Sequence, residues 1–172
     1  MNIYIAFGSN QALGRRTPRT LLCEAAETLE TCGVRLVARS SLWQSPAWPD
    51  PADPAYVNAV AQVETRLTPT ELLLCLHEVE EQFGRVRSQR NAPRTLDLDI
   101  VDFGGLVSDG GEGPVLPHPR ADQRAFVLLP LQEIAPGWKH PVTGSAISGL
   151  IDALPPGDIH ATTQLGPFVR GG

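Results

Sequence analysis

Two aspartates, Asp97 and Asp99, stand two residues apart within a run of strand-forming residues. Successive side chains of a β-strand point to opposite faces of the sheet. Both carboxylates therefore point to one face, while Leu98 and Ile100 point into a core. The Cα atoms of the two aspartates would lie roughly 6.6 Å apart at the usual strand rise. Carboxylates at this spacing are suited to hold one Mg²⁺ ion or to bracket a pair of ions.

A cluster of arginines directly precedes these aspartates and consists of Arg85, Arg87, Arg90 and Arg94. Four of the 14 basic residues of the chain therefore lie in this short segment. A planar guanidinium group forms bidentate contacts with phosphate oxygens, and carboxylates hold the cations that accompany phosphates. The combination predicts metal-dependent phosphoryl transfer. The alternative is a solvated turn whose surface ion pairs have little energetic value.

The alternative for Asp97 and Asp99 is the solvated face of an amphipathic strand, which for an arbitrary Asp-x-Asp is favoured by roughly four to one. Three features favour a site here: the strand is central in the inferred order, an arginine loop precedes it, and no basic residue alternates with the aspartates. Asp102 has the parity of Leu98 and Ile100. It is therefore expected on the other face, and it is not a third ligand unless the strand contains a bulge.

Four further polar residues are candidates, each with an ordinary structural alternative. His118 stands between two prolines, where a lone histidine is more often a surface residue than a catalytic one. Glu80 borders the buried face of a predicted helix and is either a surface carboxylate or a neighbour of the aspartates. Tyr56 and Asn58 share one face at the start of a strand. They are either packing and turn residues or an aromatic platform beside an amide that reads a heterocycle.

The chain lacks the glycine-rich motifs that cradle phosphates. Neither G-x-x-x-x-G-K-[ST] nor G-x-G-x-x-G occurs, and Gly8-Ser9-Asn10 is too short to serve as a phosphate loop. A nucleotide would therefore be held by metal ions and arginines rather than by backbone N–H groups.

Composition indicates one globular domain over residues 1–172, with 42% hydrophobic and 19% charged residues. The net charge of −5 and the pI near 5.3 oppose a general nucleic-acid binder. Cys23, Cys32 and Cys75 lack metal-ligand spacing. Cys23 and Cys75 fall within apolar helical patterns, which favours reduced packing residues. Because no signal peptide or membrane-length apolar run is present, we expect a cytoplasmic protein, monomeric and without a membrane or nucleic-acid partner.

The order of predicted elements is strand, helix, strand, strand, helix, strand, followed by C-terminal additions. This order is typical of the α+β, ferredoxin-like split βαβ fold, an antiparallel sheet with helices packed on one face. A short strand near 106–107, a third helix over 122–134 that Pro130 bends or ends, and a loop-like tail from about 154 complete the prediction. The expected strands cover residues 2–7, 34–44, 57–65 and 95–103, and the helices begin at the N-caps Thr17 and Thr68 and stop at Gly33 and Gly84.

The segment from Arg90 to Val101, Arg-Asn-Ala-Pro-Arg-Thr-Leu-Asp-Leu-Asp-Ile-Val, resembles the signature of the 6-hydroxymethyl-7,8-dihydropterin pyrophosphokinases of folate biosynthesis. Shorter stretches in the same order are also similar to that family: 6–10 to its opening, 56–59 to its pterin strand, 84–87 to its mobile loop and 117–126 to its second phosphate region. The resemblance covers most of the chain. It implies a ferredoxin-like enzyme that transfers the β,γ-diphosphate of ATP to the hydroxymethyl group of the pterin and releases AMP.

The resemblance also implies roles for individual residues. Asp97 and Asp99 are expected to hold two Mg²⁺ ions and, with Arg85 and Arg94, to form the catalytic set. The residues expected to contact ATP are His77, Glu80, Arg87, Ile100, His118 and Arg124. The residues expected to bind the pterin are Ser45, Pro46, Trp48, Tyr56, Asn58 and Phe126, of which Tyr56 and Phe126 would sandwich the ring. Asn91 stands where the family often carries an aromatic residue, and Trp48 is the candidate to replace it.

Two other classes of protein share parts of this pattern. A nucleotidyl transferase of the polymerase-palm type also carries Asp-x-Asp on a ferredoxin-like sheet, but it needs a nucleic-acid track that the acidic charge opposes. A non-enzymatic RNA-binding or regulatory module of the same fold would need stacking aromatics on its central strands, whereas aromatic residues make up only 6% of this chain.

Overall fold

The computed structural model describes residues 1–47, 50–84 and 95–169. Several residues predicted to take part in the site therefore lie outside the described residues, namely Trp48, Arg85, Arg87, Asn91 and Arg94. None of the helices in the described ranges is long and apolar enough to cross a lipid bilayer.

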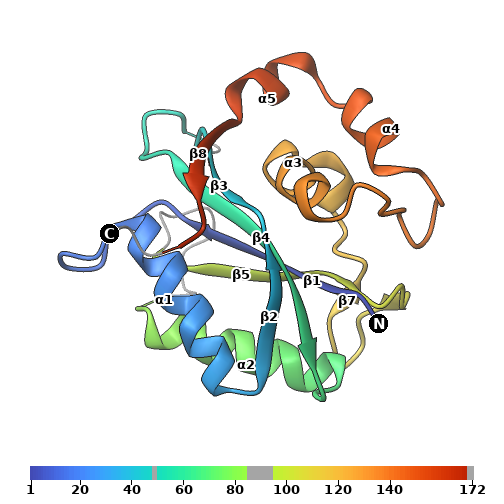
Figure 1. Cartoon of the computed structure of the whole chain (residues 1–172), viewed down its shortest axis with the longest axis horizontal. Helices are drawn as coiled ribbons and strands as arrows, with labels where there is room; N and C mark the ends of the chain where they lie inside the picture. The colour runs from blue at the N-terminus through green and yellow to red at the C-terminus, as the bar shows by residue number, and fades with distance from the viewer. Residues whose placement is uncertain (48–49, 85–94, 170–172) are drawn as a thin grey trace.

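A six-stranded antiparallel sheet forms the centre of the protein and confirms the predicted α+β, ferredoxin-like class (Figure 1). The strand order is β5-β1-β4-β3-β8, with β2 also paired to β4. The strands are β1 (Ile3–Ser9), β2 (Val34–Arg39), β3 (Ser41–Ser45), β4 (Tyr56–Thr65), β5 (Asp97–Phe103) and β8 (Thr163–Pro167). The single strand expected over 34–44 is in fact two strands, because the extended strand is interrupted at Ser40. There the Ser40 hydroxyl accepts a hydrogen bond from the Val60 N–H, and both halves then pair with β4.

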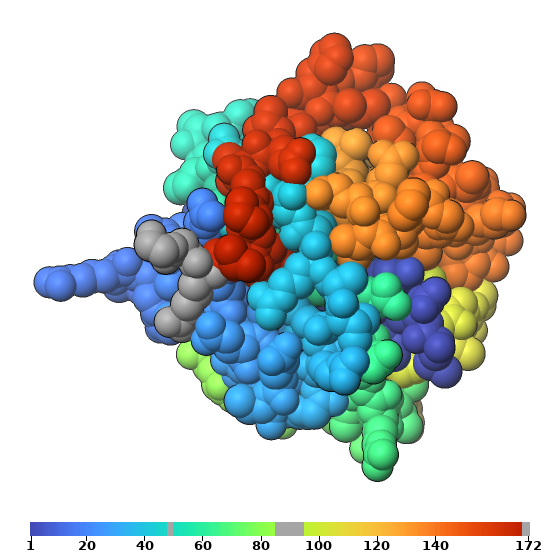
Figure 2. All heavy atoms as spheres, in the orientation of Figure 1, coloured from blue at the N-terminus to red at the C-terminus, as the bar shows by residue number. Residues whose placement is uncertain are grey.

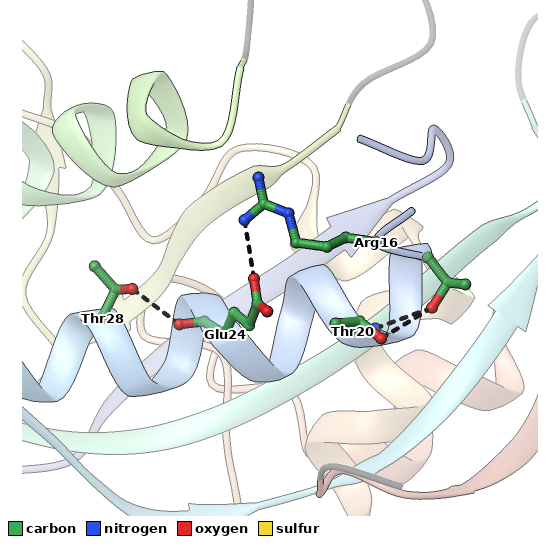
Figure 3. Close-up of polar contacts among 5 residues, drawn as sticks. Arg16, Thr20, Glu24 and Thr28 are labelled. Atoms are coloured by element: carbon green, nitrogen blue, oxygen red, sulfur yellow. Dashed lines mark hydrogen bonds and ion pairs between the residues drawn. The ribbon is translucent and has the colours of Figure 1, made fainter. Parts of the chain in front are cut away.

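Two helices cover one face of the sheet, α1 (Pro18–Thr31) and α2 (Pro69–Gln82). Thr17 caps α1 by accepting a hydrogen bond from the Thr20 N–H, and Thr68 forms the predicted capping box with Glu71 on α2. Arg16, just before α1, bonds to the carboxylate of Glu24 within the helix, eight residues further along, at 2.9 Å (Figure 3). The buried side chains of both helices meet Ile3, Ile5 and Phe7 of β1 and their neighbours on β4 and β5 in one apolar core.

The two helices of the split βαβ core share one face as predicted, whereas helices of the C-terminal additions cover the opposite face. Here α3 (Ala125–Ile134) and α4 (Ile147–Asp152) pack with Tyr4, Val60 and Val101 in a second core, and Figure 1 shows α3 to α5 on this side. The helix expected over 122–134 begins instead as a 3₁₀ turn (Ala121–Gln123), and α3 continues past Pro130 to Ile134. Glu133 fixes the end of α3 to β3 by accepting hydrogen bonds from Ser41 and from the Trp43 indole.

The C-terminal segment is ordered structure, which corrects the prediction of a loop-like tail from about 154. After α5 (Pro156–Ala161), β8 adds a strand to the sheet beside β3. Phe168 is then buried against Phe7 with a ring-centroid distance of 5.3 Å, and the guanidinium carbon of Arg39 lies 5.4 Å from the centroid of the Phe168 ring. Figure 2 shows this red segment lying on the surface against the cyan atoms of the β2–β3 region.

The connection after β5 also differs from the prediction. Gly104 and Gly105 form the expected turn with positive φ, but the short strand begins two residues later than expected. It is β6 (Ser108–Asp109), and it pairs with β7 (Val115–Leu116) in a separate two-stranded sheet.

A β-bulge places Asp102 on the face opposite to the one that strand parity predicts. The register pairs Tyr4 with Asp102 but Ile5 with Ile100, so Val101 is an extra residue in β5. The Asp102 carboxylate consequently accepts hydrogen bonds from the indole N–H of Trp138, in the segment after α3 (2.8 Å), and from the Gly105 N–H (2.9 Å). Burial, with the Asp102 charge as a second cause, raises the pKa of Tyr4.

We expect Asp102 to contribute to stability rather than to activity. Asp102→Ala leaves the buried Trp138 indole N–H without its acceptor and removes the turn hydrogen bond from the Gly105 N–H. Loss of the acceptor for a buried donor costs about 1–3 kcal/mol of unfolding free energy. Chemical denaturation measures this loss, and turnover of the folded variant should equal that of the unaltered protein. A stable Asp102→Ala protein with greatly reduced turnover would contradict this assignment.

Candidate active site

The floor of the candidate site is formed by two small residues in the middle of the sheet. In register, Gly8 of β1 lies between Asn58 of β4 and Asp97 of β5, and Ala6 lies between Val60 and Asp99. Because Gly8 and Ala6 have small side chains beside larger neighbours, they leave a depression in this face of the sheet. The cavity there has a volume of about 240 Å³ and is lined by Ala6, Phe7, Gly8, Ser45, Pro46, Tyr56, Asn58, Asp97, Asp99, Arg120, Arg124, Phe126 and Val127.

Asp97 and Asp99 form the acidic wall of this cavity, as strand alternation predicted. Both carboxylates are partly exposed, while Leu98 between them is buried in the core of α1 and α2. Glu80 of α2 is 1% exposed and its Oε2 accepts the Leu98 N–H at 2.9 Å. A buried carboxylate therefore holds the backbone of the strand at the point where it presents the two aspartates.

The described residues contain no group of three or more His, Cys, Asp or Glu side chains that could hold a metal ion. The pair Asp97 and Asp99 supplies only oxygen ligands, which suits a hard cation such as Mg²⁺. Mg²⁺ is usually bound by one or two carboxylates, with water and substrate phosphates completing its six ligands. The residues present thus fit Mg²⁺ that is delivered with, or completed by, a phosphate-bearing substrate.

His118 lies at the edge of the acidic wall, with its Nε2 atom 3.9 Å from Oδ2 of Asp99. Its Nδ1 atom accepts the N–H of Arg120 at 3.2 Å. Burial, followed by the positive charge of Arg124, lowers the pKa of His118 to about 4. The imidazole is therefore neutral at pH 7. Because Nδ1 is an acceptor, the proton of the neutral ring is on Nε2, which faces the cavity side.

Arg124 is a cationic residue of the cavity wall. Its guanidinium carbon lies 5.3 Å from the centroid of the Phe126 ring, a cation–π contact that supports the side chain. Arg124 immediately precedes α3, and Phe126 lies in its first turn. The start of one helix thus delivers both a cation and an aromatic ring to the cavity.

The remaining wall is formed by aromatic and amide groups. Tyr56 and Phe126 both line the cavity, from β4 and α3 respectively. Asn58 is 3% exposed, and its Nδ2 atom donates a hydrogen bond to the Ser45 hydroxyl at 2.8 Å. A flat heterocycle placed here would have aromatic groups at its faces and an amide at its edge.

The structure brings together eight of the predicted site residues in one cavity: Ser45, Pro46, Tyr56, Asn58, Asp97, Asp99, Arg124 and Phe126. His118 lies beside Asp99, while Glu80 lies behind the strand. Ile100 is 4% exposed and its side chain is in the core on the opposite face of the sheet. His77 lies on α2 and does not line this cavity. Nucleotide contacts of His77, Glu80 and Ile100 stay predictions.

Five residues that line the cavity were not among the predicted site residues: Ala6, Phe7, Gly8, Arg120 and Val127. No local pattern marks Gly8 or Ala6, since their position depends on which residues of β4 and β5 they meet. Arg120 had a usable signal, because it follows His118 by two residues and precedes Arg124 in a segment already assigned to phosphate.

A ferredoxin-like sheet whose paired carboxylates, arginine and aromatic rings share one cavity defines a candidate phosphotransferase site. A sequence model described as 7,8-dihydro-6-hydroxymethylpterin-pyrophosphokinase (HPPK) matches residues 4–136. The chain belongs to this family.

Relatives of the chain have similar names. It is 42% identical over 135 residues to the 2-amino-4-hydroxy-6-hydroxymethyldihydropteridine pyrophosphokinase of Methylorubrum extorquens, which covers 77% of this chain and 82% of that protein. It is 37% identical to the folic acid synthesis protein fol1 of Pneumocystis carinii over 91% of this chain, but spans only 20% of that longer protein. The solved structure of wild-type Plasmodium falciparum HPPK-DHPS matches with a TM-score of 0.67 and 14% identity, covering 88% of this chain and 44% of that one. At this identity the match shows the fold alone.

Proposed function

We propose that this chain transfers the β,γ-diphosphate of ATP to the hydroxymethyl oxygen of 6-hydroxymethyl-7,8-dihydropterin and releases AMP, a step of folate biosynthesis. The observation that carries the proposal is the row Asn58–Gly8–Asp97. It places an amide that can read a heterocycle directly across one glycine from a carboxylate that can hold a metal. Family membership and the names of the bacterial relatives support the same reaction.

In this proposal Asp97 and Asp99 hold Mg²⁺, with two ions expected. Bound Mg²⁺ would neutralise charge on the phosphate oxygens and on the departing AMP. The protein contributes the positions of the two carboxylates, because the strand and the bond from Leu98 to Glu80 fix their backbone. Two carboxylates this close together also repel one another, so a cation at this point is favoured over an empty acidic wall.

The other residues would orient the acceptor and hold the phosphates. Tyr56 and Phe126 would stack on the two faces of the pterin ring, and Asn58, held by the Ser45 hydroxyl, would bond to its edge. Arg124 would attract phosphate oxygens. His118, which is neutral at pH 7, would donate its Nε2 proton to a phosphate oxygen without adding charge. No covalent nucleophile is required, because positioning and charge stabilisation suffice for phosphoryl transfer.

The roles of Arg85, Arg87 and Arg94 at the phosphates and of Pro46 and Trp48 at the pterin belong to the same proposal. A monomeric state, a single domain over 1–172, the absence of a nucleic-acid partner and a cytoplasmic location also stay predictions.

The reaction is tested by supplying ATP, Mg²⁺ and 6-hydroxymethyl-7,8-dihydropterin and identifying the products. Label in the β-phosphate of ATP should appear in the pterin product, whereas label in the α-phosphate should appear in AMP. Omitting the pterin, or adding EDTA, should stop the formation of both labelled products. ADP, or β-label retained on a nucleotide, would refute the proposal.

A further inference from the structure

We propose that Arg120 binds the diphosphate after it has been transferred, at the pterin end of the site, and so holds the product rather than ATP. This inference rests on the proposed function. Arg120 follows the predicted site residue His118 by two positions.

The position of Arg120 is the first support. It lines the 240 Å³ cavity together with Asp97 and Asp99. It also lines a neighbouring cavity of about 470 Å³, which neither aspartate lines. Arg124 lines both cavities as well, and the other residues common to the two are Ser45, Pro46 and Phe126, all of them at the predicted pterin site. Arg120 therefore extends from the cavity with the carboxylates along residues of the predicted pterin site.

The charge of Arg120 is the second support. Three other arginines, Arg16, Arg35 and Arg39, form ion pairs with glutamates. Throughout 1–47, 50–84 and 95–169, by contrast, no carboxylate forms an ion pair with Arg120, although Asp158 lines the second cavity. Its guanidinium group is thus available to an anion, and a fork of N–H donors matches phosphate oxygens.

The contrast with Arg124 separates the roles of the two arginines. Arg124 is braced over the Phe126 ring, so its guanidinium has a fixed place in the cavity. Arg120 is exposed, and within the described residues its hydrogen bonds are made by its backbone: the N–H donates to Nδ1 of His118, and the carbonyl accepts from the Gln123 N–H. An unbraced long side chain can follow the diphosphate as it passes from the nucleotide to the pterin. After transfer the diphosphate is an ester of the pterin and carries several negative charges, which favours a second guanidinium at this end.

The test measures equilibrium binding of three ligands by calorimetry: the pterin diphosphate product, the unmodified hydroxymethylpterin, and a non-hydrolysable ATP analogue with Mg²⁺. Arg120→Gln should weaken binding of the product by roughly tenfold or more, since one charge-assisted pair is lost. Binding of the unmodified pterin and of the ATP analogue should change less than about twofold. Arg120→Lys, which keeps the charge but loses the fork, should fall between the two proteins.

Arg66→Gln is the matched control, because Arg66 is an exposed arginine just beyond the end of β4 that is remote from Tyr56. It should leave all three affinities unchanged. Unchanged product binding in Arg120→Gln would overturn the inference, and so would an equal loss for product and unmodified pterin, since Arg120 would then act on the ring or the fold. Failure of the proposed function would be distinct: the unaltered protein would form no AMP.

Discussion

Replacing Asp97 or Asp99 with alanine lowers turnover by at least roughly 10³-fold, while the protein stays folded. Each carboxylate would supply ligands to Mg²⁺, and the charge on the transferred phosphates is what the metal offsets, so loss of a ligand acts on the transition state. Both side chains are partly exposed at a cavity wall. Their removal relieves repulsion between two like charges.

Steady-state turnover, together with thermal denaturation, checks this prediction. Asp109→Ala is the matched control, because Asp109 is an exposed strand aspartate on β6 and does not line the cavity. It should change neither quantity. Near-normal turnover of the Asp97 or Asp99 variants would show that the strand face is merely solvated, and a collapse in melting temperature would point to a structural role instead.

Gly8→Val should abolish binding of the pterin without destabilising the sheet. Gly8 does not have a positive φ, so a β-branched residue is sterically allowed and suits a strand. A Cβ atom at this position would lie 3.6 Å from Oδ1 of Asn58 and 3.8 Å from a ring carbon of Tyr56, both ordinary contacts. The two methyl groups of valine would then extend into the space that a ring between Tyr56 and Phe126 must occupy. We expect the affinity for the pterin to fall by at least about 100-fold.

A graded series makes the Gly8 prediction specific. Gly8→Ala places only the Cβ atom in the cavity and should weaken pterin binding by roughly tenfold or less, with Gly8→Val well beyond it. Fluorescence titration with the pterin measures affinity, and chemical denaturation measures stability. If Gly8→Val binds the pterin normally, the heterocycle does not lie over the row Asn58–Gly8–Asp97, and the assignment of this cavity is wrong.

Features that depend on short stretches of chain were predicted well from the sequence. The shared face of Asp97 and Asp99 follows from strand alternation, which acts over neighbouring residues, and the structure has it. The caps at Thr17 and Thr68 and the stops at Gly33 and Gly84 are also local, because each satisfies backbone groups of its own helix. The long signature around the aspartates indicated the family for the same reason.

Features that depend on pairing between distant segments were not predicted correctly from the sequence. Asp102 was assigned to the wrong face because the bulge at Val101 arises from the register between β5 and β1, which alternation within β5 does not contain. The segment from 154 has no strong pattern of its own. It forms regular structure because β8 pairs with the edge of β3 and Phe168 packs against Phe7.

The sequence by itself therefore determined which residue types carry the chemistry and which of them alternate onto one face of a strand. The tertiary structure decided that Gly8 lies between Asn58 and Asp97, and so how the acceptor site and the carboxylates come to share one hollow. The physical reason is that a cavity is the space left where small and large side chains from different strands lie side by side. The position of that space depends on cross-strand register and packing, which no single segment of the sequence encodes.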